Sequence, residues 1–141
     1  MVKVNKNRIN VLNDTEPDIE SGEYVLYWVL MYRRTRYNHA LQRAIEWANE
    51  LEKPLLVFEP LQLKYEWASD RFQQFIIESM KDSYDAYSKS KAGYFPFVET
   101  AEGELNGLLE SLASKASVVI SDDYPAYFIP QMAAKGKGIV T

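Results

Sequence analysis

Three arginines lie within four positions of one short segment, at Arg33, Arg34 and Arg36. A guanidinium group presents its N–H donors in a plane, so it can bind carboxylate or phosphate groups in pairs and can stack on flat rings. The segment follows the apolar run YVLYWVLM and precedes an amphipathic stretch. The arginines are therefore candidates for holding an anionic or planar ligand. The alternative is that they are solvated, or paired with the acidic residues that this chain has in plenty.

Other polar residues follow a second apolar run, SVVIS, as Asp122, Asp123 and Tyr124. Two adjacent acids could form a metal site or an acid pair. They could equally cap the start of the next helix, where a negative charge gains about 0.3–1 kcal/mol. Asn38 fits a helix N-cap better than a ligand-binding group. His39, the only histidine, has no Ser or Asp at a recognisable spacing, so we expect a surface helix residue. The spacing predicts no catalytic residues and no metal site.

Composition narrows the class of protein. The 141 residues are enough for one domain with a core. A net charge of −4 is not the global basic signature of a nucleic-acid-binding protein, although it allows a local basic patch. The absence of cysteine excludes disulfides, thiolate metal sites and cysteine nucleophiles. No segment approaches the roughly 20 apolar residues of a membrane span, and the N-terminus lacks the apolar core of a signal peptide. We expect a cytoplasmic protein.

Strands and helices alternate along the chain. The sequence predicts strands over residues 24–31, 55–58, 94–98, 117–121 and 138–141, and helices over residues 38–52, 69–89, 105–112 and 126–135. This alternation predicts an α/β fold: a Rossmann-like, doubly wound, mostly parallel five-stranded sheet, in order 3-2-1-4-5, with helices on both faces. Pro96 removes a ladder donor, so its strand should lie at an edge. Residues 1–22 are expected to form an N-terminal arm and loop, and residues 23–141 the domain.

The predicted topology places a site at one edge of the sheet. Ligands of open α/β sheets bind at the carboxyl ends of the strands, where the strand order reverses. The loops after the first and fourth strands should therefore face each other. They carry the arginines and Asn38 on one side and Asp122, Asp123 and Tyr124 on the other, with Phe58 and Glu59 as the neighbouring wall. No GxGxxG motif is present, so a dinucleotide fingerprint is missing.

The order of three motifs carries a family resemblance. The stretch YVLYWVLMYRRTRYNHAL resembles the N-terminal α/β domain of the DNA photolyase and cryptochrome family, and its class II-like branch in particular, where the strand carries a Tyr-Trp pair, here Tyr27 and Trp28. SDRFQQFIIESM resembles the second helix of that branch, and VVISDDYPAYFIPQMA its fourth strand and following loop. The similarity runs from about Glu23 to the end. The family loop more often carries an acid where this chain has Tyr37.

The resemblance implies the N-terminal domain of a deoxyribodipyrimidine photolyase, a lyase that uses light and reduced FAD to repair pyrimidine dimers in DNA. In this family FAD binds a C-terminal helical domain, and the N-terminal domain often holds an antenna chromophore, a deazaflavin or a folate. We therefore expect a fragment that lacks the helical domain, binds no FAD and is inactive alone. The expected antenna-binding residues are Arg33, Arg34, Arg36, Asn38, Phe58, Glu59, Asp122, Asp123 and Tyr124.

The expected partners are the chain's own C-terminal helical domain, damaged DNA through the full-length protein, and a second copy bound through the exposed interdomain surface. Two other functions stay open: a stand-alone nucleotide-binding or regulatory α/β module, and a cryptochrome-type light sensor without repair activity. The gene downstream of Thr141 separates these, since a continuing helix-rich frame favours the photolyase and a stop codon the stand-alone module.

Overall fold

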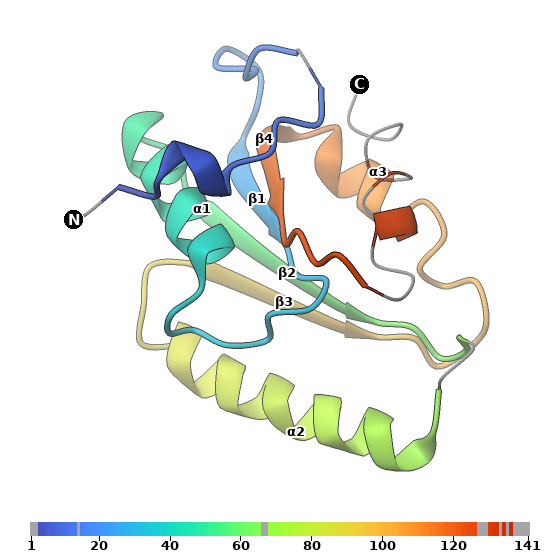
Figure 1. Ribbon diagram of the computed structural model, residues 1–141. Coiled ribbons are helices and arrows are strands. Elements are labelled where there is room, and N and C mark those ends of the chain that lie inside the picture. Colours follow the sequence, from blue (N-terminus) through green and yellow to red (C-terminus); the bar gives the residue numbers. More distant parts are fainter. Residues whose placement is uncertain are drawn as a thin grey trace.

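A computed structural model describes residues 3–13, 15–65, 68–126, 130–132, 134 and 136. Its elements are a 3-10 turn η1 (Lys6–Arg8), β1 (Tyr24–Trp28), α1 (His39–Glu50), β2 (Leu55–Leu61), α2 (Asp70–Tyr87), β3 (Gly93–Val98), α3 (Leu108–Ala113) and β4 (Ala116–Ser121). The strands pair in parallel in the order β3-β2-β1-β4 (Figure 1). The predicted α/β fold and this part of the strand order are confirmed. The predicted fifth strand, residues 138–141, lies outside the described residues.

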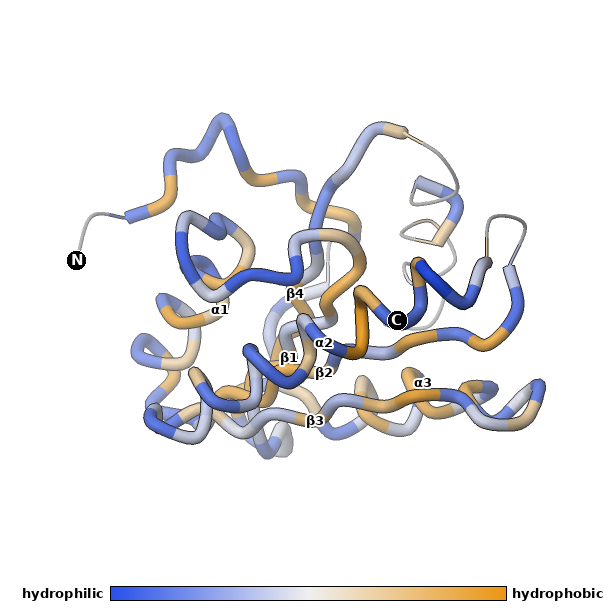
Figure 2. Tube along the Cα trace, turned by 90° about the horizontal axis from the view of Figure 1, so that it is seen from below, coloured by the Kyte–Doolittle hydropathy of each residue, from blue (hydrophilic) through white to orange (hydrophobic). Residues whose placement is uncertain are grey.

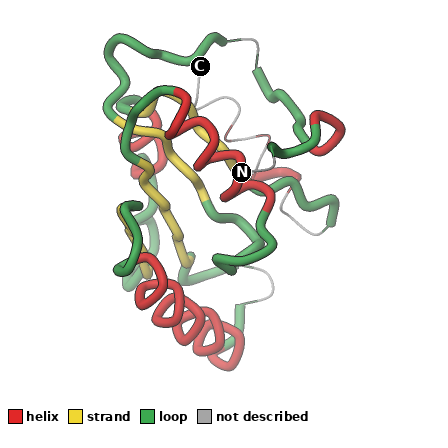
Figure 3. The backbone as a smooth tube through the Cα atoms, turned by 90° about the vertical axis from the view of Figure 1, so that its left-hand side faces the viewer, coloured by secondary structure: helices red, strands yellow, loops and turns green. Residues whose placement is uncertain are grey.

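Strand β1 is buried on both faces, as its uninterrupted apolar run predicts. Successive side chains of a strand point to opposite faces. Val25 and Tyr27 pack in the cluster that includes Leu41 of α1, whereas Leu26 and Trp28 pack in the cluster that includes Leu109 of α3. Helices α1 and α2 thus cover one face and α3 the other, which Figures 1 and 3 show from two sides. The point where the strand order reverses falls between β1 and β4.

Side-chain caps begin the two long helices where the sequence predicts them. The Oδ1 atom of Asn38 accepts from the backbone N–H of Leu41 at 3.0 Å, and the hydroxyl of Ser69 accepts from the N–H of Phe72 at 3.3 Å. Each cap satisfies one of the N–H groups that a helix leaves without an internal partner. Polar and apolar residues alternate along these helices in Figure 2, the pattern of helices with one buried face.

Two strands end about three residues away from the predicted position. Strand β1 ends at Trp28 and not at residue 31, because the N–H groups of Leu30 and Met31 turn to the carboxylate of Asp122. Strand β2 continues past Phe58 to Leu61 and includes Pro60. A proline is tolerated there because residues 59–61 pair with β3 alone, after β1 has ended, so the missing N–H faces no partner strand.

The remaining elements follow the prediction with one shift. Strand β3, which contains Pro96, lies at an edge of the sheet as expected. Helix α3 begins at Leu108, three residues later than predicted, after Gly107 with a φ of 75°. Glycine adopts this left-handed conformation without the steric cost of a side chain. Of the predicted helix over residues 126–135, residues 130–132 and 134 are helical, as is residue 136.

The N-terminal arm lies against the domain. The N–H of Val4 donates to Oε1 of Glu46 in α1 at 2.7 Å, and the N–H of Asp18 donates to the carbonyl of Ser117 in β4 at 2.9 Å. Burial opposes ionisation of Glu46, but the hydrogen bonds from Arg43 and Val4 outweigh it and hold the pKa of this carboxyl below its ordinary value. Within the described residues, no helix has the length and apolar character to cross a membrane.

Candidate functional site at the carboxyl edge of the sheet

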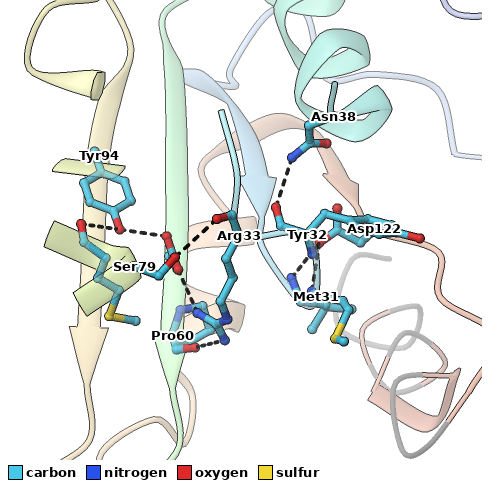
Figure 4. A network of polar contacts seen from close by, with 11 residues as sticks. Met31, Tyr32, Arg33, Asn38, Pro60, Ser79, Tyr94 and Asp122 are labelled. Atoms are coloured by element: carbon cyan, nitrogen blue, oxygen red, sulfur yellow. Dashed lines mark hydrogen bonds and ion pairs between the residues drawn. The ribbon is translucent and has the colours of Figure 1, made fainter. Parts of the chain in front are cut away.

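A buried carboxylate joins the loops after β1 and β4. Asp122 is 2% exposed, and its Oδ2 atom accepts from the backbone N–H groups of Leu30, Met31 and Tyr32 at 3.0, 2.9 and 3.0 Å. Figure 4 shows this arrangement, which we call the Asp122 nest: the three N–H groups of residues 30–32 and the carboxylate that they hold. The loops after β1 and β4 thus lie side by side, as predicted. They are joined directly by hydrogen bonds between residues 30–32 and Asp122.

Tyr27 and Asn38 complete the nest from the α1 side. The buried hydroxyl of Tyr27 donates to Oδ1 of Asp122 at 2.7 Å and accepts from Nδ2 of Asn38 at 2.9 Å. Burial, and then the negative charge of Asp122, raise the pKa of Tyr27 far above its ordinary value, so this phenol keeps its proton and donates. Nδ2 of Asn38 also lies 3.1 Å from the carbonyl oxygen of Tyr32 and 3.0 Å from that of Arg34. The loop between β1 and α1 is therefore held at several points.

The first of the three arginines is an internal ion-pair partner. Arg33 Nη1 lies 2.8 Å from Oε1 of Glu59, and Nη2 donates to the carbonyl of Pro60 at 3.1 Å. The side chain of Arg33 is 17% exposed and that of Glu59 only 2%. Tyr94 donates its hydroxyl to the other oxygen of Glu59 at 2.7 Å. Burial and the adjacent Glu59 raise the pKa of Tyr94 well above its ordinary value, so this proton too stays on the phenol.

The other two arginines, Arg34 and Arg36, are exposed. The guanidinium of Arg34 lies over the ring of Tyr32, 5.3 Å from its centroid, and Tyr32 meets the ring of Tyr124 edge-on at 6.0 Å. Tyr37 is 91% exposed, with a φ of 52° that is uncommon for a non-glycine residue. Flat and cationic groups therefore line the outer side of the β1–α1 loop. This surface, the Arg34 rim, consists of Tyr32, Arg34, Arg36, Tyr37 and Tyr124.

The structure sorts the predicted residues into two groups. Arg33, Asn38, Glu59 and Asp122 are engaged in internal contacts, whereas Arg34, Arg36 and Asp123 are exposed and Tyr124 is half-buried. Phe58 is 1% exposed and packs beside Phe95 on the α3 side of the sheet, away from the side where Glu59 points. His39 is an exposed first residue of α1, as expected. Among the described residues no group of histidines and carboxylates could hold a metal ion.

Comparison with known proteins finds one similarity. No protein-family model matches the chain. Over 79 residues, however, it is 43% identical to the deoxyribodipyrimidine photolyase of Methanothermobacter thermautotrophicus. The chain is similar to a photolyase over this stretch. The matched stretch is 56% of this chain and 18% of that enzyme, so the chain spans less than a fifth of the photolyase that it matches.

The sequence reasoning missed two buried polar groups at this edge of the sheet. Tyr27 lies at the centre of the nest, and the signal was present: a tyrosine in a fully buried strand needs a partner for its hydroxyl. Glu99, directly after β3, is 3% exposed and accepts from the N–H groups of Leu63 and Gly103 at 2.7 and 2.8 Å. These backbone hydrogen bonds hold the pKa of Glu99 below its ordinary value despite burial. Its signal was an acid at a predicted strand end.

Proposed function

We propose that this chain is the N-terminal α/β domain of a cytoplasmic deoxyribodipyrimidine photolyase of the class II-like branch, which repairs pyrimidine dimers in DNA with light. The observation that carries the proposal is the 43% identity over 79 residues to a photolyase. The parallel sheet with its strand order 3-2-1-4 supports it. In this proposal residues 23–141 form the domain and residues 1–22 an arm, while FAD binds in a C-terminal helical domain of the full-length enzyme.

Light-dependent repair tests this function directly. An oligonucleotide with one pyrimidine dimer is incubated with the full-length gene product, and separately with the 141-residue chain plus FAD. We expect the full-length protein to restore the undamaged oligonucleotide in light and not in darkness, and the chain alone to do neither. Flavin binding without repair by the full-length protein would indicate a light sensor instead. Repair by the chain alone, or a stable FAD complex of it after gel filtration, would contradict the division of roles.

The antenna chromophore of this proposal lies at the Arg34 rim. Guanidinium groups bind anionic tails and stack on flat rings. The guanidinium of Arg34 lies over the ring of Tyr32, and none of the ion pairs among the described residues includes it. Tyr124 adds a second ring, which meets that of Tyr32 edge-on, and the exposed Arg36 adds a second cation. Arg33, Asn38, Glu59 and Asp122 contribute by fixing the loop. A deazaflavin or folate, with a planar ring and an anionic tail, fits these groups.

A titration with a deazaflavin, followed by fluorescence, tests the rim. Loss of one charge-assisted hydrogen bond is worth about 1.5–3 kcal/mol, so Arg34→Ala or Arg36→Ala should weaken binding about ten- to a hundredfold. Arg71→Ala is the matched control, because it removes one exposed arginine from α2. If neither rim variant weakens binding by about threefold, the arginines are surface charges. Failure of the unaltered protein to bind either a deazaflavin or a folate would contradict the antenna role.

A surface for the proposed C-terminal domain, or for a second copy, is also part of the proposal. Helix α2 exposes large apolar side chains at Phe72 (47%), Phe75 (67%) and Tyr84 (58%). Monomers rarely expose contiguous apolar patches of the size that interdomain contacts bury. Sedimentation of the chain should reveal self-association that Phe75→Glu weakens. A chain that stays monomeric at high concentration would count against this surface.

A further inference from the structure

Asp122 is a buried carboxylate that has no cation beside it among the described residues. Asp122 is 2% exposed, and none of the ion pairs among the described residues includes it. A buried charge is costly unless other groups compensate it. Here the compensation comes from dipoles: the three N–H groups of residues 30–32 and the hydroxyl of Tyr27. Convergent backbone N–H groups of this kind form an anion-binding nest.

The Asp122 nest lies at the edge of the sheet where open α/β proteins bind their ligands. It follows the first strand of a parallel sheet, beside the point where the strand order reverses, and there open α/β proteins place their ligands. The N–H groups at such a position commonly hold a phosphate or another anion of the ligand. In this protein the carboxylate of Asp122, in the loop after β4, accepts hydrogen bonds from these N–H groups. Four donors therefore contact this carboxylate, three at Oδ2 and one at Oδ1.

We propose that Asp122 is a built-in anion that determines the ligand specificity of this edge of the sheet. It fills the position where a phosphate would bind and repels a second negative charge. A ligand here therefore presents a neutral ring or a cationic group toward the nest, and its anionic groups lie outward on Arg34 and Arg36. The inference is independent of the proposed function, because it concerns any ligand that approaches the carboxyl ends of β1 and β4.

Titration with inorganic phosphate at constant ionic strength tests the claim. The amide signals of Leu30, Met31 and Tyr32 are followed by nuclear magnetic resonance in the isotope-labelled chain. We expect no saturable shift in the unaltered protein. In Asp122→Ala the nest is vacated, and saturable shifts should appear at the same three amides, with an affinity at least about tenfold above that of the unaltered protein. Asp82→Ala removes an exposed aspartate of α2 and should behave like the unaltered chain.

A rescue measurement covers the case in which Asp122→Ala is poorly folded. Formate replaces the deleted carboxylate, so it should raise the melting temperature of this variant, or restore its folded state, more than it affects the unaltered protein or Asp82→Ala. Saturable phosphate shifts at residues 30–32 of the unaltered protein would overturn the proposal. So would a folded Asp122→Ala variant whose nest responds to neither anion, or an unfolded one that formate does not restore.

Discussion

Replacing Tyr27 by phenylalanine tests whether the nest holds a charged group. The substitution keeps the buried ring and removes the hydroxyl that donates to Asp122 at 2.7 Å. A hydrogen bond to a charged group contributes about 1.5–3 kcal/mol and a neutral one about 0.5–1.5 kcal/mol. Asn38 keeps two carbonyl oxygens as acceptors, so its amide is not left without a partner. We therefore expect Tyr27→Phe to lower the free energy of unfolding by about 1.5–3 kcal/mol.

Urea denaturation and thermal melting, monitored by circular dichroism, measure this loss. For a chain of this size, about 3 °C of melting temperature corresponds to 1 kcal/mol, so the midpoint should fall by roughly 5–9 °C. Tyr24→Phe is the matched control, since its hydroxyl donates to the neutral carbonyl of Leu112, also at 2.7 Å. It should cost about 0.5–1.5 kcal/mol. A loss in Tyr27→Phe no larger than in Tyr24→Phe would refute the reasoning that Asp122 is held as an anion.

Three further predictions concern the same edge of the sheet. Glu59→Gln should lower the free energy of unfolding, measured by urea denaturation, by about 1.5–3 kcal/mol. Glu102→Gln changes an ion pair that is exposed on both sides, so it should lower this free energy by less than about 1 kcal/mol. Equal losses in the two variants would contradict the ion-pair argument. Because the folded pKa of Glu99 is lowered, its stabilisation is complete above about pH 4.3 and is lost as the pH falls through the folded value. The stability difference between the unaltered protein and Glu99→Gln should therefore shrink in acid, and a difference that grows instead would be inconsistent with this sign. Ser69→Ala should lower the free energy of unfolding by about 1 kcal/mol through loss of a helix cap. Asn38→Ala should lower it by more, because Asn38 also donates to two loop carbonyls. Equal melting temperatures of the two variants would show that Asn38 acts as a cap alone.

The fold followed from the sequence because its signals are local. Buried apolar runs, Asn38 and Ser69 as caps, and Pro96 at an edge are each visible within a few residues, and each was confirmed. The predicted end of β1 was wrong because it depends on a contact between residues that are far apart in the chain. It depends on Asp122, which is 92 positions from Leu30 in the chain. No local pattern reveals that this carboxylate takes the N–H groups that would otherwise continue the strand.

For the candidate site, the sequence indicated which residues belong to one loop but not which of them are internal. The sequence placed three arginines in one loop, and it could not tell which of them would be internal. That choice depends on Glu59, whose carboxylate lies within 2.8 Å of Arg33 and is almost fully buried. Arg33 is paired with an acid, whereas Arg34 and Arg36 are exposed. Whether the two exposed arginines hold a ligand stays a prediction.

The carboxyl edge of the sheet carries one buried carboxylate at or near the end of each of three strands: Glu59 in β2, Glu99 after β3 and Asp122 after β4. Each finds its donors inside the protein, from an arginine, a tyrosine or backbone N–H groups. The negative charges of these three buried carboxylates are therefore already compensated inside the protein. The exposed cations of the β1–α1 loop are Arg34 and Arg36. Exposed charges are screened by salt, whereas ring stacking is not. Binding of an anionic chromophore should thus weaken with added salt to a limit set by its ring, and a ligand without an anionic tail should already be at that limit.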